Sequence, residues 1–143
     1  MIGVNTNYVL DTNSLIMSLS SRNKYSYIWD AFVTGRYTLC VTNEILTEYE
    51  EVISRNINQR VARIVLSYFM LLPNVKFVDP HYSFGLIHAD FDDNKFVDCA
   101  ITAGARYIVT EDHHYDVIKW KEFPGLDVVG LDEFLKHLLK INL

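Results

Sequence analysis

Short apolar runs alternate along the chain with longer segments in which apolar residues recur every three or four positions. The short runs are typical of buried strands, and the longer segments of amphipathic helices. This pattern predicts strands at residues 8–10, 37–41, 75–78, 107–109 and 128–129. It predicts helices at 13–19, 25–33, 44–53 with Thr42 or Asn43 as cap, 56–72, 93–103 and 131–139, a loop at 81–90 and a short helical piece after Asp112. Strands separated by helices indicate an α/β sandwich with a largely parallel sheet.

The size and composition of the chain predict one domain. It has 143 residues, 50% of them hydrophobic, and no shift in composition marks a boundary, so we expect a single domain over residues 1–143. The first residues do not resemble a signal peptide, and no uncharged apolar run approaches the roughly 18 residues of a membrane helix. We therefore expect a cytoplasmic protein without a membrane partner. Cys40 and Cys99 lack metal-binding spacing and are expected to be buried thiols.

The net charge of -5 argues against broad, nonspecific adhesion to nucleic acid, which usually requires a basic face. Bound cations would cancel part of this charge if several acids were metal ligands. The surrounding Arg22, Lys24, Arg36 and Lys95 would then form a local positive rim, although such scattered charges usually belong to a solvated surface.

Acidic residues recur at the ends of predicted strands and the beginnings of helices. Asp11 directly ends the strand at 8–10, and Asp112 follows the strand at 107–109. Acids at the carboxyl ends of parallel strands are well placed to form a ligand site. A central strand makes an unpaired carboxylate at Asp11 costly, whereas Asp112 has the ordinary alternative of being a turn former. Asp116, four residues later, would line the same rim.

Helical spacing indicates which way the acids near the predicted helix at 93–103 face, because side chains project at about 100° intervals. Asp93 falls on the apolar stripe of its predicted helix, with Asp92 near one border. Asn94 lies outside the other border and Asp98 points largely away. A core-facing acid at a helix start is a candidate metal ligand, but a helix cap is the chemically silent alternative.

The helix at 44–53 contains four acids, and its periodicity leaves two of them open as site residues. Glu48 and Glu50 flank the apolar stripe on opposite borders, whereas Glu44 and Glu51 face solvent. Spacing alone does not choose between Glu48 and Glu50. Taken in isolation, such a group of acids is usually a solvated face.

Four segments together resemble the PIN-domain family: VLDTN at 9–13, EILTEYEEVI at 44–53, DDNKFVDCAITAGARYIVTED at 92–112 and GLDEFL at 130–135. Their order and spacing are similar to those of the bacterial branch of VapC-like ribonucleases, the toxin components of toxin–antitoxin systems. The resemblance covers nearly the whole chain. It implies a three-layer α/β/α sandwich and a hydrolase that cleaves single-stranded RNA.

The resemblance also implies the site residues. In such proteins four acids bind one or two Mg²⁺ or Mn²⁺ ions, and these acids correspond here to Asp11, Glu48, Asp93 and Asp112, which decides between Glu48 and Glu50. Asn13 and Thr110 match supporting polar residues, and Asp92, Asp98 and Asp116 are alternate or supporting acids. An antitoxin protein and a homodimer are potential partners. The loop at 81–90 has no pattern that identifies substrate-binding residues.

Two other functions remain open from the sequence. A haloacid-dehalogenase-type phosphatase also places an aspartate at the end of its first strand, but it requires a second aspartate two residues later, where this chain has Asn13. A noncatalytic PIN-like module that binds RNA or protein would not need all four acids. The metal-dependent ribonuclease is therefore the favoured hypothesis.

Overall fold

The computed structural model describes residues 5–80, 85, 87, 94–116 and 126–141. Its strands are β1 (Asn7–Leu10), β2 (Thr38–Val41), β3 (Val75–Phe77), β4 (Tyr107–Val109) and β5 (Asp127–Val129). Its helices are α1 (Thr12–Ser18), α2 (Ser26–Val33), α3 (Asn43–Asn56), α4 (Gln59–Leu71), α5 (Asn94–Ala103), the 3₁₀ helix η2 (His113–Tyr115) and α7 (Leu131–Ile141). Every predicted strand and helix has its counterpart, with differences mainly at the ends.

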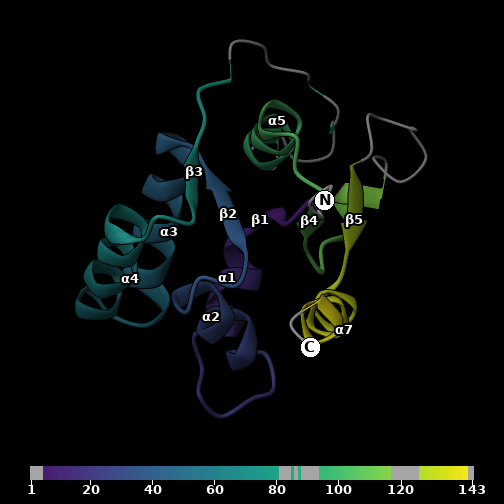
Figure 1. Ribbon diagram of the computed structural model, residues 1–143. Coiled ribbons are helices and arrows are strands. Elements are labelled where there is room, and N and C mark those ends of the chain that lie inside the picture. Colours follow the sequence, from purple (N-terminus) through teal and green to yellow (C-terminus); the bar gives the residue numbers. More distant parts are fainter. Residues whose placement is uncertain (1–4, 81–84, 86, 88–93, 117–125, 142–143) are drawn as a thin grey trace.

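The five strands form one parallel sheet in the order β3-β2-β1-β4-β5. Helix α5 packs across β1, β2 and β4, while α1, α2 and α7 lie on the opposite side of the sheet (Figure 1). The α3–α4 hairpin lies beside β2 and β3 (Figure 1). This is the predicted three-layer α/β/α sandwich, with β1 at the centre of the sheet.

Side-chain caps explain where several helices begin. Thr42 accepts a hydrogen bond from the Ile45 N–H at 3.1 Å and begins α3, and Asn58 accepts one from the Val61 N–H at 2.8 Å and begins α4. The predicted helix at 56–72 therefore began too early, because α3 extends through Asn56 and the Asn58 cap separates the two helices.

The side chain of Asn94 is buried, which corrects its expected place outside the apolar stripe of α5. Its amide donates to the Ile87 carbonyl at 2.8 Å and accepts from the Ile87 N–H at 2.9 Å. Both polar groups of the side chain are thereby satisfied, and burial without a partner would have been costly. Helical spacing could not reveal a backbone partner seven residues earlier.

Tyr49 ties α3 to the end of the central strand. Its side chain is buried, and its hydroxyl donates to the Leu10 carbonyl at 2.5 Å, one residue before Asp11. Burial also raises the pKa of the Tyr49 hydroxyl well above its ordinary value, so it remains a donor.

Among the described residues, no helix is long and apolar enough to cross a membrane.

We expect Tyr49→Phe to lower the free energy of unfolding by roughly 1–3 kcal/mol, because it leaves a buried carbonyl without this donor. Urea denaturation measures the change. Tyr25→Phe is the matched control, because the Tyr25 hydroxyl bonds to the exposed Asp132 at 2.8 Å and should contribute no more than about 0.5 kcal/mol. Equal losses in the two variants would contradict an anchoring role for Tyr49.

Candidate functional site

The chain order of the strands reverses at the centre of the sheet, between β1 and β4. β2 and β3 extend from one side of β1, whereas β4 and β5 extend from the other. Open parallel sheets bind ligands at such a switch point, beyond the carboxyl ends of the strands. Asp11 follows β1 and Asp112 follows β4 by three residues, so both predicted acids lie beside this crevice.

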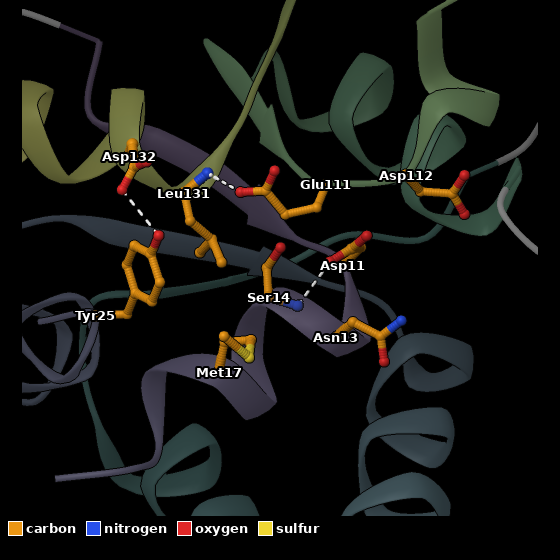
Figure 2. Close-up of a pocket in the computed structure, with 9 residues that line it drawn as sticks. All are labelled: Asp11, Asn13, Ser14, Met17, Tyr25, Glu111, Asp112, Leu131 and Asp132. Carbon is orange, nitrogen blue, oxygen red and sulfur yellow. Dashed lines mark hydrogen bonds between the residues drawn. The ribbon is translucent and has the colours of Figure 1, made fainter. Parts of the chain in front are cut away.

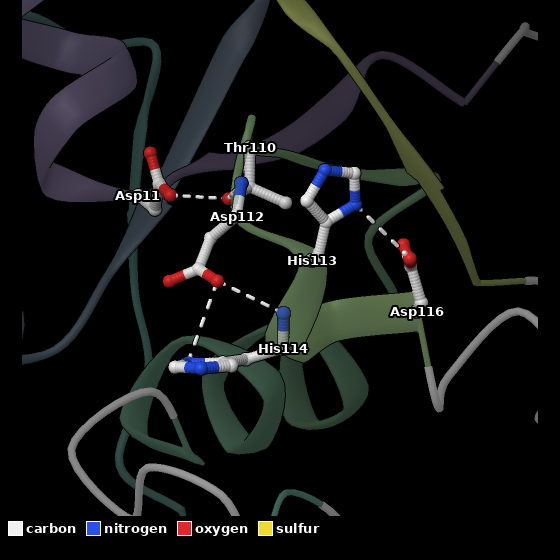
Figure 3. A network of polar contacts seen from close by, with 6 residues as sticks. All are labelled: Asp11, Thr110, Asp112, His113, His114 and Asp116. Atoms are coloured by element: carbon white, nitrogen blue, oxygen red, sulfur yellow. Dashed lines mark hydrogen bonds and ion pairs between the residues drawn. The ribbon is translucent and has the colours of Figure 1, made fainter.

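Thr110 connects these two acids. Its hydroxyl donates to Asp11 Oδ2 and accepts a hydrogen bond from the Asp112 N–H at 2.9 Å (Figure 3). Asp112 also caps η2, since its Oδ1 accepts from the His114 N–H at 2.9 Å. The threonine therefore connects the carboxyl group of Asp11, which follows β1, with the backbone of Asp112, which follows β4.

Asp11 is a buried acid whose described hydrogen-bond partners are neutral. Its side chain caps α1 by accepting from the Ser14 N–H at 2.8 Å, and the residue is only 7% exposed. Burial raises the pKa of the Asp11 carboxyl above its ordinary value, and the nearby Asp112 charge raises it further, against the lowering effect of Thr110 and Ser14. The charged form of Asp11 would thus be stabilised by a cation.

Glu48 joins Asp11 and Asp112 around a cavity of about 250 Å³. This cavity is also lined by Thr12, Asn13, Val52, Arg55, Asn56 and Phe96. The Glu48 carboxylate accepts hydrogen bonds from the Thr12 hydroxyl and from the Lys95 ammonium, the latter at 2.6 Å. Glu50 is exposed, so Glu48 is the acid of α3 that lies with Asp11.

A second cavity of about 590 Å³ shares Asp11, Asn13 and Asp112 with the first (Figure 2). Its wall includes Asn13, Met17, Tyr25 and Leu131, together with the acids Glu111 and Asp132. Glu111 accepts a hydrogen bond from the Leu131 N–H at 2.8 Å, at the start of α7. The sequence gives no local signal for this contact, because Glu111 and the start of α7 are twenty residues apart.

The other predicted site residues have different positions. Asp92 and Asp93 lie outside the described residues, although Phe96, near the start of α5, lines the smaller cavity. Asn13 lines both cavities. Asp98 is half-buried and lines neither, and Asp116 pairs with His113 at 3.3 Å (Figure 3).

A family model described as a PIN domain matches residues 7–114. The chain belongs to the PIN-domain family. No curated protein matches this PIN-domain chain by sequence. The family match includes Asp11, Glu48, Asp93 and Asp112 within its span.

Solved structures show the same fold at low sequence identity. A chain of VapBC2 from Rickettsia felis, in a crystal structure bound to a DNA fragment from their promoter, is 17% identical with a TM-score of 0.56, and the match covers 87% of this chain and 98% of that chain. VapC20 from Mycobacterium tuberculosis, a Sarcin–Ricin loop cleaving toxin, is 12% identical with a TM-score of 0.56, covering 83% and 97%. This PIN domain therefore has a VapC-like fold.

The donor atoms around the PIN-domain crevice fit a hard divalent cation. Within the described residues, no three His, Cys, Asp or Glu side chains converge closely enough to form a metal site by themselves. Asp11 and Asp112 nevertheless supply carboxylate oxygens, the ligands that Mg²⁺ and Mn²⁺ prefer. No described lysine, arginine or histidine forms an ion pair with Asp11. The buried charge therefore fits a cation, with further ligands required.

The raised pKa of Asp11 predicts a pH-dependent effect of its charge. The folded protein binds the proton of the Asp11 carboxyl more tightly than the unfolded chain does. The stability gained from this tighter binding is fully present below about pH 3.9, the unfolded-state value, and is lost as pH rises through the folded-state pKa. In EDTA at pH 7, Asp11→Asn should melt above wild type by at least about 2–4 °C, the shift produced by roughly 1 kcal/mol. The difference should shrink towards pH 4.

Thermal melting with and without Mn²⁺ measures this effect. Mn²⁺ should raise the melting temperature of wild type more than that of Asp11→Asn, because a bound ion stabilises the folded state. Glu50→Gln, an exposed change on α3, controls for the general effect of removing an acid. An Asp11→Asn variant less stable than wild type at pH 7 in EDTA would mean that the bonds from Thr110 and Ser14 outweigh the cost of burying the charge.

Proposed function

We propose that this PIN-domain protein is a divalent-cation-dependent endoribonuclease that cleaves single-stranded RNA in the cytoplasm, as the toxin of a toxin–antitoxin pair. The observation that carries the proposal is the position of Asp11, Glu48 and Asp112 around one cavity at the switch point of the sheet. A hydrolase acting on a phosphodiester needs concentrated positive charge at this point. The clustered acids provide ligands for it.

In this proposal, the cation site is formed by Asp11, Glu48, Asp93 and Asp112, with Mg²⁺ or Mn²⁺ as the ion. When bound, such an ion lowers the pKa of its water and stabilises charge on the phosphate. Thr110 orients Asp11 and Asp112 through its two hydrogen bonds. Asn13 supports substrate or ligands from the cavity wall, and Asp92, Asp98 and Asp116 remain alternate acids.

Single substitutions of the proposed ligands should each reduce RNA cleavage by at least about 100-fold, because every ligand contributes to both affinity and orientation of the ion. The variants are Asp11→Asn, Glu48→Gln, Asp93→Asn and Asp112→Asn, assayed on single-stranded RNA with Mn²⁺, Mg²⁺ or EDTA. Glu50→Gln is the matched control because it removes an exposed acid from the same helix. It should cleave as wild type does.

Assays of the same variants on RNA and on a small phosphoester separate the competing functions. RNA binding without cation-dependent cleavage would favour a noncatalytic module. Turnover of a small phosphoester, lost in Asp11→Asn but retained in Glu48→Gln, would favour the phosphatase chemistry. Loss of cleavage in Glu50→Gln with an active Glu48→Gln would show that the wrong acid of α3 had been assigned.

The toxin role makes a separate prediction. Expression of wild type in bacteria should slow growth, whereas Asp93→Asn should not, because that variant lacks a proposed ligand. Growth curves after induction measure the effect, with equal protein amounts verified for both. Normal growth combined with RNA cleavage in vitro would indicate a housekeeping or highly selective ribonuclease.

An antitoxin partner is part of this proposal. The R. felis relative is a VapBC2 complex bound to a DNA fragment from their promoter, which supports the expectation that this chain binds an antitoxin protein. Homodimer formation is expected on the same grounds of family resemblance. Copurification with the product of an adjacent gene, and the mass of the purified chain in solution, test the two partners independently.

A further inference from the structure

A lysine already pairs with Glu48, one of the acids that line the smaller cavity. The Lys95 ammonium lies 2.6 Å from Glu48 Oε1, and the two side chains are only 11% and 24% exposed. The other carboxylate oxygen, Oε2, accepts a hydrogen bond from the Thr12 hydroxyl. The ammonium also lies 5.9 Å from the centre of the Phe96 ring, which lines the same cavity. Glu48 is therefore partnered on both oxygens.

Asp11 and Glu48 have opposite environments within this cavity. Asp11 is held by the neutral donors Thr110 and Ser14, whereas Glu48 has a positive charge in direct contact. Withdrawing an ammonium from water is costly unless an opposite charge compensates it. Among the described acids that line this cavity, Glu48 is thus the one paired with a lysine, whereas the ion pair of Asp112 is with His114, at 3.4 Å.

Two-metal nucleases hold their ions about 3.5–4 Å apart, each close to carboxylates. A second ion at Glu48 would have to displace Lys95 or lie close to its charge. Such an ion would be repelled, because like charges a few Å apart interact strongly at the edge of a protein interior. Asp11 has no described ion pair, and Asp112 is paired with His114 at 3.4 Å, a side chain that carries a charge only when protonated, so neither acid has a permanent cation beside it.

We infer that Lys95 takes the place of a second metal ion, so that the site holds one divalent cation at Asp11 and Asp112 and one ammonium at Glu48. This inference rests on the proposed function and narrows its ligand set, because Glu48 then contributes to the site through its ion pair with Lys95 and not as a ligand of the divalent ion. An RNA phosphodiester entering the cavity then meets one divalent ion and one fixed ammonium. Lys95 acts as a positioning residue for Glu48 and sets the number of ions.

The alternative is that the ion pair only connects α5 with α3. A structural link predicts that loss of Lys95 destabilises the fold equally with and without metal. A cation substitute predicts that loss of Lys95 frees Glu48 for an ion, so that added Mn²⁺ restores the lost stability. Metal stoichiometry and melting temperature therefore distinguish the two roles without any measurement of activity.

The test is calorimetric titration of Mn²⁺ into the metal-free full chain, paired with melting curves in EDTA and in Mn²⁺. Wild type should bind one ion. Lys95→Met should bind a second ion, or bind the first at least about tenfold more tightly because a nearby positive charge is gone. Its loss of melting temperature in EDTA should be largely recovered in Mn²⁺.

Three further variants sharpen the result. Lys95→Arg keeps the charge and should keep the one-ion stoichiometry. The double variant Lys95→Met with Glu48→Gln removes both charges and should not gain the second ion. Lys140→Met removes an exposed lysine from α7, away from both cavities, and should behave as wild type does.

Two bound ions in wild type would overturn the inference while leaving the proposed ribonuclease intact, and this outcome needs no variant to fold. One ion in both wild type and Lys95→Met, with equal affinity and equal loss of stability in EDTA and Mn²⁺, would also overturn it and assign Lys95 to structure. No Mn²⁺ binding by wild type would overturn the metal site of the proposed function and this inference with it.

Discussion

A buried carboxylate at the end of the central strand is the constraint around which the candidate site is arranged. Asp11 is buried directly after β1, and its side chain accepts its described hydrogen bonds from the neutral donors Ser14 and Thr110. Such a charge is expensive in a protein interior and is tolerated where hydrogen bonds and a bound cation compensate it. The Tyr49 hydroxyl, which holds the Leu10 carbonyl, and Thr110, which joins Asp11 to Asp112, both act on this same point. Packing of α3 against the sheet and geometry of the site are therefore linked.

The acids of the cavity divide into two kinds according to their neighbours. Asp11 and Asp112 share Thr110, and the pKa of Asp11 is raised first by its burial and further by the nearby charge of Asp112. Glu48, by contrast, carries Lys95 and Thr12. This asymmetry gives a physical reason for a site with unequal cation positions. It also shows why four similar carboxylates in a sequence need not have four similar roles.

The periodicity of the chain predicted the elements well because the spacing of apolar residues reflects which face of a helix or strand is buried. β1 is central as expected, and α1 begins directly after it with Asp11 as its cap. The errors occur where a polar side chain finds a distant or unforeseen partner. Asn58 begins α4 later than the apolar spacing suggested, and Asn94 is buried because the backbone of Ile87 satisfies it. Glu111 likewise bonds to the start of α7, a contact that joins residues twenty positions apart.

The sequence by itself determined the class of fold, which strands are followed by acids, and the membership in the PIN-domain family. These features depend on local pattern and on the order of motifs. It left Glu48 and Glu50 equivalent by periodicity, since both flank the apolar stripe of one helix. The family resemblance favoured Glu48, and in the tertiary structure Glu48 lines the same cavity as Asp11. Only the tertiary structure brought Lys95 to Glu48. The physical reason is that two acids on opposite borders of an apolar stripe are equivalent by helical spacing. Charge compensation, in contrast, depends on which side chains of other elements come within a few Å.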